Sequence, residues 1–487
     1  MIALGVLVEA CPGARLAHGE ADTAIRGLCL DSRRAGPGFL FAALPGRRAD
    51  GTRFVGDALA RGAVAVLARP GTDVPGDAAL VVADDPRAAL AAMARRFHGA
   101  PDERLAVVGV TGTDGKTSTV AMLRAACEAA GLPAASAGTL GADGAPSALT
   151  TAEAPELWEF LAASAAGGAR VAAIEVSSIA VAERRVAGLR FRGAVLTSLG
   201  HDHLDYHGSP EAYRAAKRAL FEALDERAFA VIASGDDPFD DFARAAAPAR
   251  VIRVGTAAGC DWRVEDHRAD ARGATFRLAG PRLAIPLATR RPAPWDALNL
   301  AAAVAAAVAL GADPEAAARG AAAVGTIPGR WQVIDEGQPF AAVVDYAHTP
   351  DAVDRVVALA RRLSRGRVIV VLGAGGERDP HKREPMGRLA ARHADLLVIT
   401  DDNPRGEDPE RIASRLLAGA RGEDCTVERI ASRPAAIAAA VDAARPGDVV
   451  LVLGKGHETT QHVGGHVLEM DDRELLRAAL RHARETR

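Results

Sequence analysis

The residues best suited to chemistry begin with a glycine-containing loop. The run at 105–110 is apolar, as in a buried strand, and the sequence after the loop has helical composition. Between a strand and a helix, glycine lets backbone N–H groups approach phosphate oxygens, while Lys116 would reach the terminal phosphates and Thr117 could ligate Mg²⁺. The pattern predicts a nucleotide phosphate site, and a tight turn with a surface lysine is the alternative. The predicted nucleotide-binding residues are Thr111, Gly112, Thr113, Asp114, Gly115, Lys116, Thr117 and Ser118.

A second group of polar residues follows two later apolar runs. Glu175 comes after the run at 171–174, so we expect its carboxylate at a strand end, near an ATP-bound Mg²⁺ that prefers oxygen ligands. A cluster of histidine and aspartate follows the run at 194–197. Zinc is the competing explanation, but no cysteine lies near the cluster and its spacing matches no usual zinc pattern. The cluster consists of His201, Asp202, His203, Asp205 and His207.

The elements that must position these residues alternate along the chain. A chain of 487 residues exceeds the roughly 250 to 300 residues at which a single core stops growing, so we expect two or three domains and take three as the working number. The polar stretch at 99–103 and the segment at 326–330, which breaks a helical pattern, predict the boundaries. The predicted class is α/β, with a small domain at 1–100, a nucleotide-binding domain with a mostly parallel sheet at 101–330 and a Rossmann-like domain at 331–487.

The predicted sheets rest on apolar runs of strand length. A helix is expected over 300–310, where alanine dominates. Strands of the last domain end in polar loops, which is where ligands bind in Rossmann-like sheets. The predicted strands are 63–67, 79–82, 105–110, 171–176, 194–197, 341–344, 368–372, 396–399 and 449–453.

The composition excludes several functional classes. Hydrophobic residues make up 49% of the chain and charged residues 25%, as in an ordinary globular protein. The formal net charge is −3, so the chain lacks the basic field that nucleic acid requires. The five cysteines are scattered without a C-x-x-C pair, and we expect buried, reduced thiols. Because Glu9 interrupts an apolar start that has no basic segment, we expect no secretory signal and no membrane insertion, hence a cytoplasmic protein.

The phosphate loop departs from the general pattern at one position. Val110 stands five residues before Gly115, where G-x-x-x-x-G-K-[ST] has glycine. The form TGTDGKT resembles instead the ATP loop of the Mur ligase family and its folylpolyglutamate synthetase relatives, and DHLDYHG at 202–208 resembles a second signature of that family. The resemblance implies an enzyme that uses ATP and Mg²⁺ to form an amide bond through an acyl phosphate.

The same resemblance implies roles for further residues. Glu175 and His203 would hold Mg²⁺ with Thr117, and Lys217 would be carbamoylated by CO₂ to N6-carboxylysine. Without the resemblance, an unmodified surface lysine is the alternative for Lys217. The implied catalytic residues are therefore Lys116, Lys217, His203 and Glu175. The remaining implied ATP contacts are Asn299 at adenine, Arg330 at the γ-phosphate, and Asp345 and His348 in the segment VDYAHTPDAV.

The N-terminal segment LDSRRAGPGFLFAALPGRRADGTRF resembles the uridine-nucleotide domain of the family member that adds the third residue of the peptidoglycan stem peptide. It implies UDP-N-acetylmuramoyl-L-alanyl-D-glutamate as a substrate. Three positions depart from the usual pattern: Leu149 replaces a common asparagine, Ile179 a frequent histidine and Glu183 a frequent glutamine. The implied substrate contacts are Leu30, Ser32, Arg47, Arg48, Ala49, Thr150, Thr151, Ser177, Glu183 and Arg185.

The amine substrate is implied by the last domain. The segment DNPR at 402–405 is similar to the motif of family members that add meso-diaminopimelate, whereas members that add lysine generally lack its arginine. A second carboxylate on the amine needs a guanidinium fork, which Arg378 and Arg405 can supply. Glu458 and the Gly454 carbonyl would receive the distal ammonium group. The implied contacts are Arg378, Asp402, Asn403, Pro404, Arg405, Gly454 and Glu458.

The expected partners are thus ATP, the uridine-nucleotide peptide and meso-diaminopimelate, and we expect a monomer. A family member that adds another amino acid, such as L-lysine, or that acts on another substrate is the alternative. A folylpolyglutamate synthetase fits less well because that family lacks the DNPR segment and the uridine domain. A nucleotide-dependent switch would not need Glu175, His203, Lys217 and the two arginines together.

Overall fold

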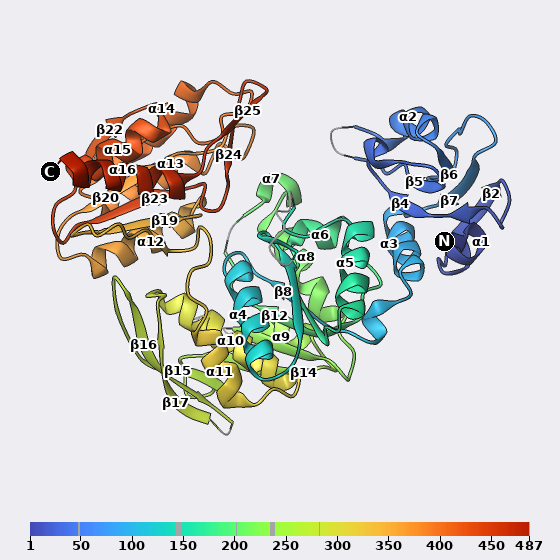
Figure 1. Ribbon diagram of the computed structural model, residues 1–487, viewed down its shortest axis with the longest axis horizontal. Helices are drawn as coiled ribbons and strands as arrows, with labels where there is room; N and C mark the ends of the chain where they lie inside the picture. Colours follow the sequence, from blue (N-terminus) through green and yellow to red (C-terminus); the bar gives the residue numbers. More distant parts are fainter. Residues whose placement is uncertain (47–48, 143–148, 201, 234–238, 282, 487) are drawn as a thin grey trace.

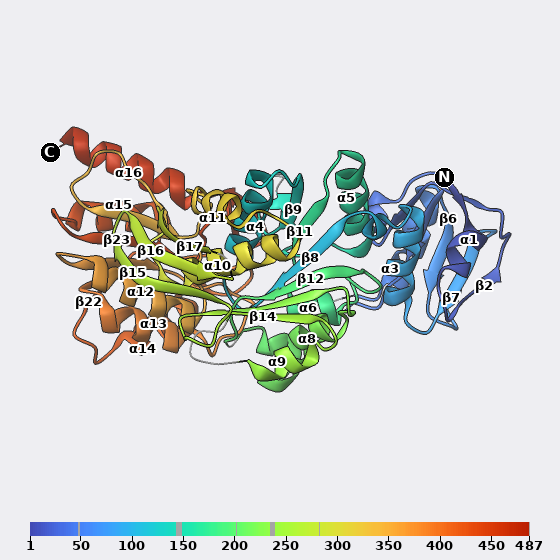
Figure 2. The ribbon, with the colours of Figure 1, turned by 90° about the horizontal axis from the view of Figure 1, so that it is seen from below.

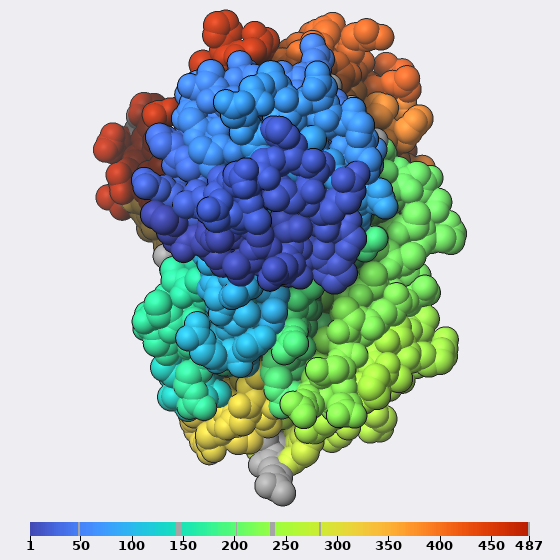
Figure 3. All heavy atoms as spheres, turned by 90° about the vertical axis from the view of Figure 1, so that its right-hand side faces the viewer, coloured from blue at the N-terminus to red at the C-terminus, as the bar shows by residue number. Residues whose placement is uncertain are grey.

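The computed structural model describes residues 1–46, 49–142, 149–200, 202–233, 239–281 and 283–486. Figures 1 and 2 show three α/β units that follow one another along the longest axis. We name them from their first and last elements as the N-terminal unit (2–97), the central unit (101–322) and the C-terminal unit (332–486). Figure 3 views the molecule from the end that the N-terminal unit covers. The predicted α/β class with three units is confirmed, whereas Arg47, Arg48 and His201 lie outside the described residues.

The N-terminal unit is built on a five-stranded sheet of order β2-β7-β6-β5-β4, in which only β2 runs antiparallel to its neighbour. One apolar cluster on the sheet contains Leu7 and Met93, and a second contains Phe41 and Val55. The elements are β1 (Ile2–Ala3), α1 (Leu4–Glu9), β2 (Ala14–His18), β3 (Ala24–Ile25), β4 (Gly27–Cys29), η1 (Ser32–Arg34), β5 (Phe39–Ala42), η2 (Gly51–Phe54), α2 (Val55–Ala60), β6 (Ala63–Ala68), β7 (Ala79–Ala83) and α3 (Pro86–Phe97).

The central unit contains a ten-stranded sheet of order β10-β9-β11-β8-β12-β13-β14-β15-β16-β17. Its strands from β9 to β15 are parallel, and β10, β16 and β17 pair antiparallel. The elements are η3 (Pro101–Glu103), β8 (Ala106–Thr111), α4 (Lys116–Ala129), β9 (Ala134–Gly138), β10 (Gly141–Ala142), α5 (Ala154–Ala166), β11 (Val171–Glu175), α6 (Ser178–Ala182), β12 (Phe191–Leu196), α7 (Leu204–His207), α8 (Pro210–Glu222), β13 (Phe229–Ala233), α9 (Asp240–Ala245), β14 (Arg250–Gly255), β15 (Trp262–Asp270), β16 (Gly273–Gly280), β17 (Leu283–Thr289), α10 (Pro294–Ala309) and α11 (Pro314–Ala322).

Helices cover both faces of the central sheet, because its parallel strands are apolar on both sides. Leu123 of α4 and Leu300 of α10 belong to one core cluster, and Trp158 of α5 and Phe221 of α8 belong to the other. The sheet continues into β15, β16 and β17, which lie on the side of the central unit away from the N-terminal unit (Figures 1 and 2). This antiparallel extension was not predicted from the sequence.

The C-terminal unit has a six-stranded sheet of order β18-β19-β23-β20-β21-β22, parallel except for β18. Val357, Met386 and Leu416 pack in one core cluster, and Ile437 and Leu476 in another, so this sheet is also covered on both faces. The elements are β18 (Gln332–Val333), β19 (Ala341–Asp345), α12 (Pro350–Leu363), β20 (Val368–Leu372), α13 (Arg383–His393), β21 (Leu396–Ile399), α14 (Pro409–Ala420), β22 (Thr426–Arg429), α15 (Arg433–Ala443), β23 (Val449–Leu453), β24 (Thr460–Val463), β25 (His466–Glu469) and α16 (Asp472–Thr486).

The nine predicted strands are confirmed, most to within one residue. Three coincide with β20, β21 and β23 over their whole length. The largest difference is at β12, which begins at Phe191 and not at Ala194, because Arg192 is exposed within an otherwise buried strand and interrupts the apolar run. In the described part of the chain, no helix is both long enough and apolar enough to cross a bilayer. The boundaries near 100 and 330 stay predictions.

Candidate active site

The phosphate loop joins the end of β8 to the start of α4. Gly115 precedes the helix with φ +87°, and a Cβ there would lie 2.7 Å from Oδ1 of Asn299. A Cβ on Gly112 would lie 2.0 Å from Oγ1 of Thr197. Both glycines are therefore required by close contacts, and Gly115 also by its backbone conformation. The first free N–H groups of α4 follow directly, as an anion site at a helix N-terminus requires.

Residues after β12 hold the loop from behind. Thr197 Oγ1 donates to the carbonyl oxygens of Thr111 at 3.2 Å and Asp114 at 2.5 Å. The Ser198 side chain accepts from the Asp114 N–H at 2.9 Å, and its carbonyl accepts from the Thr113 N–H at 3.0 Å. These bonds fix the loop without using the N–H groups at the start of α4. The neighbouring strand thus pre-forms a phosphate cradle.

Two lysines converge on one carbonyl group of this loop. Lys116 Nζ donates to the Gly112 oxygen at 2.8 Å and to the Thr113 oxygen at 3.0 Å. Lys217 Nζ, from α8, donates to the same Gly112 oxygen at 2.8 Å. Lys217 is 2% exposed, and burial, reinforced by the charge of Lys116, holds its pKa well below the ordinary lysine value. The site therefore favours the neutral, nucleophilic amine of Lys217.

Glu175 occupies the strand end where the sequence predicted it. It is the last residue of β11, which pairs with β8, and it is buried. Its Oε1 accepts from the Thr139 N–H at 2.8 Å, and its Oε2 accepts from the Thr139 hydroxyl at 3.1 Å. Thr139 belongs to the turn after β9 and was not singled out from the sequence. These two bonds orient the carboxylate within the cleft described below.

His203 lies in the loop between β12 and α7. Its backbone is left-handed, with φ +52°, and its N–H donates to Asp202 Oδ1 at 2.8 Å. Burial lowers the pKa of its imidazole, so the neutral ring, able to bind a metal, is favoured. Among the described residues no cluster of three or more His, Cys, Asp or Glu side chains could hold a metal alone. The hydroxyl of Thr117 and the carboxylate of Glu175 fit a Mg²⁺ that takes its other ligands from phosphate and water.

The predicted ATP contacts surround the loop. Asn299, in α10, is buried with its side-chain amide against Gly115. Arg330 lies between the central and C-terminal units, with Nη2 at 3.5 Å from Thr117 Oγ1 and its guanidinium 4.4 Å from the centre of the Tyr346 ring. The structure thus brings both residues to the phosphate loop.

Asp345 and His348 flank a tight turn after β19. Asp345 accepts from the N–H groups of Trp331 at 2.7 Å and Ala347 at 2.8 Å, and burial raises its pKa. The ring Nδ1 of His348 lies 2.8 Å from the Tyr346 carbonyl oxygen. Burial, reinforced by Lys382, lowers the pKa of His348 to about 4. The pair therefore presents a fixed turn and a neutral imidazole to the cleft.

A buried ion pair and one lysine support these residues and were missed from the sequence. Arg291 and Asp296 are joined at 2.8 Å with side chains 4% and 3% exposed, and Arg291 also donates to the Arg330 carbonyl at 3.1 Å. Lys382 Nζ donates to the His348 carbonyl at 2.9 Å. The only sequence signal for the pair of Arg291 and Asp296 was an arginine five residues before an aspartate, and this spacing is not specific to any kind of site.

A cleft of about 930 Å³ between the central and C-terminal units collects most of the predicted residues. Its lining includes the departures Leu149 and Ile179. Of the described predicted residues, Leu30, Ser32, Ala49, Thr111, Gly112, Thr151, Glu183, Lys217 and Pro404 lie outside the lining. The predicted residues that line the cleft are Thr113, Asp114, Gly115, Lys116, Thr117, Ser118, Thr150, Glu175, Ser177, Arg185, His203, Asn299, Arg330, Asp345, His348, Arg378, Asp402, Asn403, Arg405, Gly454 and Glu458.

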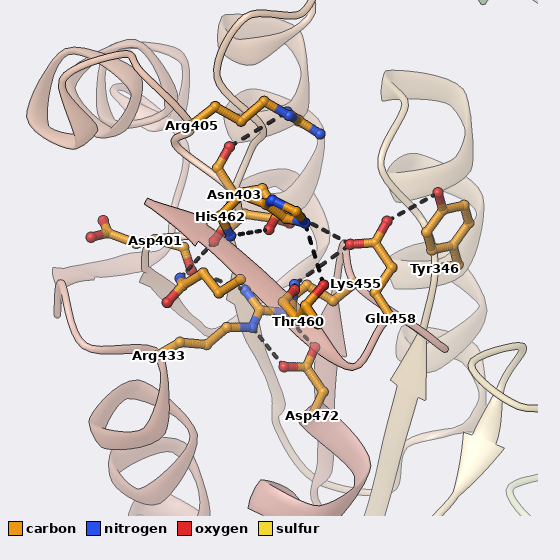
Figure 4. Close-up of polar contacts among 12 residues, drawn as sticks. Tyr346, Asp401, Asn403, Arg405, Arg433, Lys455, Glu458, Thr460, His462 and Asp472 are labelled. Carbon is orange, nitrogen blue, oxygen red and sulfur yellow. Dashed lines mark hydrogen bonds and ion pairs between the residues drawn. The ribbon is translucent and has the colours of Figure 1, made fainter. Parts of the chain in front are cut away.

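The predicted amine-binding residues follow three strands of the C-terminal unit, β20, β21 and β23, and Figure 4 shows those after β21 and β23. Asn403, after β21, donates from Nδ2 to Glu458 Oε2 at 2.9 Å and accepts at Oδ1 from the His462 N–H at 2.9 Å. The hydroxyl of Tyr346 donates to Glu458 Oε1 at 3.4 Å. Glu458 follows β23, and its carboxylate is held by residues from two other segments, one after β21 and one after β19.

The two predicted arginines meet beside Gly375. A Cβ on Gly375 would lie 3.0 Å from Nη1 of Arg405 and 3.8 Å from Cγ of Arg378. Arg405 donates from Nη1 to the Gly376 carbonyl at 2.7 Å, and its backbone has φ +55°. Its own N–H donates to the His462 carbonyl at 2.8 Å. The main chain of Arg405 is therefore anchored independently of its guanidinium.

The predicted uridine-substrate residues form two groups. Leu30 packs on an N-terminal core cluster, Ser32 begins η1 and Ala49 is half-buried. In the central unit, Thr151 donates to the Glu175 carbonyl at 2.9 Å, and Arg185 donates to the Thr151 carbonyl at 3.1 Å. The second group thus adjoins Glu175.

The departure at Glu183 connects units. Its Oε2 lies 2.6 Å from Nη2 of Arg87 in α3, and its Oε1 accepts from the Tyr206 hydroxyl at 2.7 Å. Arg34 and Glu156 form another ion pair between the same two units. A glutamate at 183 therefore joins the N-terminal unit to α7, next to His203.

Three α/β units with a phosphate loop facing a shared cleft define the architecture of a three-domain, ATP-dependent ligase. Family models match in the same order: the Mur ligase family catalytic domain at 24–98, the Mur ligase middle domain at 110–307 and the Mur ligase glutamate ligase domain at 329–456. The chain belongs to the Mur ligase family and is an ADP-forming, ATP-dependent ligase.

Relatives resemble the chain over its whole length. The UDP-N-acetylmuramoyl-L-alanyl-D-glutamate–2,6-diaminopimelate ligase of Geobacillus kaustophilus is 40% identical over 98% of each chain, and that of Streptomyces coelicolor is 40% identical over 98% of this chain and 97% of its own. A solved structure of a ligase of that name is 30% identical, with a TM-score of 0.68 over 99% of each chain. The MurF ligase of Thermotoga maritima in complex with ADP is 21% identical, with a TM-score of 0.68 over 96% of this chain and 100% of its own, and shares the fold.

Proposed function

We propose that this chain joins meso-diaminopimelate to the D-glutamate of UDP-N-acetylmuramoyl-L-alanyl-D-glutamate, using ATP, in peptidoglycan precursor synthesis. The observation that carries the proposal is the single cleft in which the phosphate loop faces the segment 402–405. The similarity to relatives of that name supports it. One chain supplies every lining residue, so the proposal requires only a monomer, and the use of ATP supports a cytoplasmic location.

In the first step, an oxygen of the D-glutamate γ-carboxylate attacks the γ-phosphorus of ATP. The bond from that phosphorus to the β–γ bridging oxygen breaks, ADP leaves, and an acyl phosphate remains. Lys116 and Arg330 offset the charge on the transferred phosphoryl group, as the short distance from Arg330 to Thr117 supports. Mg²⁺, when bound through Thr117, Glu175 and His203, would supply further charge neutralisation at the phosphates.

Lys217 would act after carbamoylation. Its neutral amine attacks CO₂, a C–N bond forms, and one proton leaves the nitrogen to solvent, so that a neutral amine is replaced by a carboxylate. The lowered pKa of Lys217 supports this reaction, because only the unprotonated amine is nucleophilic. A carboxylate at this position would also attract the ammonium group of Lys116, since Nζ of Lys116 and Nζ of Lys217 both lie at the Gly112 carbonyl.

In the second step, an amine nitrogen of diaminopimelate attacks the acyl carbon. The C–O bond to phosphate breaks, inorganic phosphate leaves, and the nitrogen loses a proton as the amide forms. Arg378 and Arg405 would hold the distal carboxylate, and Glu458 and the Gly454 carbonyl the distal ammonium group. Asn403 and Tyr346 orient the Glu458 carboxylate for this contact. Positioning and charge, more than covalent work by side chains, account for the rate.

The test measures ATP-dependent phosphate release with UDP-N-acetylmuramoyl-L-alanyl-D-glutamate and, in parallel, meso-diaminopimelate, L-lysine or no amine. Product masses identify the amide. Release and a mass gain with diaminopimelate are expected to far exceed those with L-lysine, and neither is expected without an amine. Preference for L-lysine would retain the ligase and refute the role of the two arginines. No turnover with any amine would refute the proposed substrate and direct attention to Leu149, Ile179 and Glu183.

A further inference from the structure

A fully buried ion pair lies next to the two segments, 402–405 and 454–458, that carry most of the predicted amine-binding residues. Arg433 is the first residue of α15 and Asp472 the first of α16, and both side chains are 0% exposed. Nε of Arg433 donates to Oδ1 of Asp472 at 2.7 Å, and Nη2 to Oδ2 at 2.6 Å. Burying two charges is expensive, and a buried pair is often no more stabilising than apolar residues of similar volume. Stability alone therefore does not account for this pair.

The guanidinium also binds the carbonyl groups of two strand ends. Nη2 of Arg433 donates to the Leu453 oxygen at 2.8 Å, and Nη1 to the Asp401 oxygen at 3.4 Å (Figure 4). Leu453 ends β23 immediately before Gly454, and Asp401 immediately precedes Asp402. In the sheet, β20 lies between β21 and β23, so these two strands share no ladder of hydrogen bonds. Arg433 bridges segments that the sheet does not join directly.

We propose that Arg433, oriented by Asp472, is a positioning residue that sets the separation of segments 401–405 and 453–458 and thereby shapes the amine site. The inference rests on the proposed function of that site. The bond from Asn403 to Glu458 crosses the same gap nearer the cleft, at 2.9 Å. That bond depends on the separation that Arg433 sets.

The geometry requires arginine. Asp472 and the two carbonyl groups together accept four hydrogen bonds, which come from three nitrogens of one planar group. A lysine has three donors on a single atom and cannot span these acceptors. Arg433→Lys would keep the charge beside Asp472 and lose at least one of the two carbonyl contacts.

The experiment compares Arg433→Lys and the double variant Arg433→Met/Asp472→Leu with the wild type. The double variant removes both buried charges, so it keeps a folded core if the single variant does not. The control is Arg367→Met, which breaks an ion pair to Asp448 at 2.9 Å. Arg367 directly precedes β20 and Asp448 directly precedes β23, so this pair lies at the other end of the strands from the amine site. The measurements are KM for ATP and for meso-diaminopimelate, with thermal unfolding.

We expect KM for diaminopimelate to rise about tenfold or more in both Arg433 variants, since displacement of a binding group by about 1 Å can cost on the order of 100-fold. KM for ATP should stay within about twofold, and the control should leave both constants unchanged. An unchanged KM for diaminopimelate, or an equal rise in KM for diaminopimelate and KM for ATP, would overturn the inference. Turnover of diaminopimelate by the wild type would still uphold the proposed function in that case. Absence of wild-type turnover with diaminopimelate would overturn both.

Discussion

Arg405→Met is the substitution that best separates recognition of diaminopimelate from stability. The guanidinium lies beside Gly375 with Arg378, and the residue is half-buried. Methionine keeps the unbranched side chain and removes the charge. The left-handed backbone at this position costs the variant about what it costs the wild type, and the bond from its N–H to the His462 carbonyl is retained.

The expected loss follows from one charged contact. A hydrogen bond to a charged group contributes about 1.5 to 3 kcal/mol, which corresponds to a fall of about 10- to 150-fold in kcat/KM for diaminopimelate. The side-chain bond to the Gly376 carbonyl is also lost. That loss should lower the free energy of unfolding by about 1 kcal/mol.

The assay is steady-state phosphate release with diaminopimelate or L-lysine as the amine, with ATP and the uridine-nucleotide peptide saturating. L-Lysine lacks the distal carboxylate, so its kcat/KM should change less than about threefold. Arg421→Met, an exposed arginine of the same unit, is the matched control. An equal loss for both amines, or no loss for diaminopimelate, would refute the argument that Arg405 reads the second carboxylate.

Three further predictions follow from the loop and its surroundings. Lys217→Ala should lower kcat by at least about 100-fold, with partial recovery in formate, because a small carboxylate can occupy the position of the carbamate; recovery that chloride reproduces would contradict this. Gly115→Ala should raise KM for ATP about tenfold or more. The control Gly131→Ala has a similar positive φ of +72° but no atom within 4 Å of the added Cβ, so it should cost only about 1 kcal/mol of stability and leave KM for ATP unchanged. Equal effects of the two substitutions on KM for ATP would show that the contact with Asn299 is not the cause. His348 keeps its neutral form when folded, with a pKa of about 4 against an ordinary 6.5, so the free energy of unfolding that depends on it is present above pH 6.5 and lost as pH falls toward 4. Between pH 7 and pH 4, urea unfolding should show that the wild type loses about 3 kcal/mol more of its free energy of unfolding than His348→Gln does. If the free energies of unfolding of the two proteins fall in parallel with pH, the loss belongs to other groups.

The strands of the parallel sheets were predictable because they are buried on both faces. Such strands are continuous apolar runs, and those at 368–372, 396–399 and 449–453 coincide with β20, β21 and β23. The strand β15 was missed because it alternates buried and half-buried residues at its start and is exposed toward its end. A strand of this kind carries little apolar signal of its own, and its pairing with β14 and β16 defines it.

The phosphate loop and its lysine were predictable because a strand, a short glycine loop and a helix lie next to one another in the sequence. Local sequence also carried the DNPR segment and the family resemblance. The roles of individual site residues stay predictions, since the fold locates the side chains without testing what they bind.

The sequence by itself determined the α/β class, the three units, the buried strands and the residue types available for chemistry. Tertiary structure alone decided that Lys116 and Lys217, about 100 residues apart in the chain, share the Gly112 carbonyl. It also decided that Arg433 spans two strands that the sheet keeps apart. The reason is physical: periodicity and loop chemistry are local properties of the chain, whereas desolvation, shared hydrogen-bond acceptors and the separation of strand ends exist only once distant segments pack together.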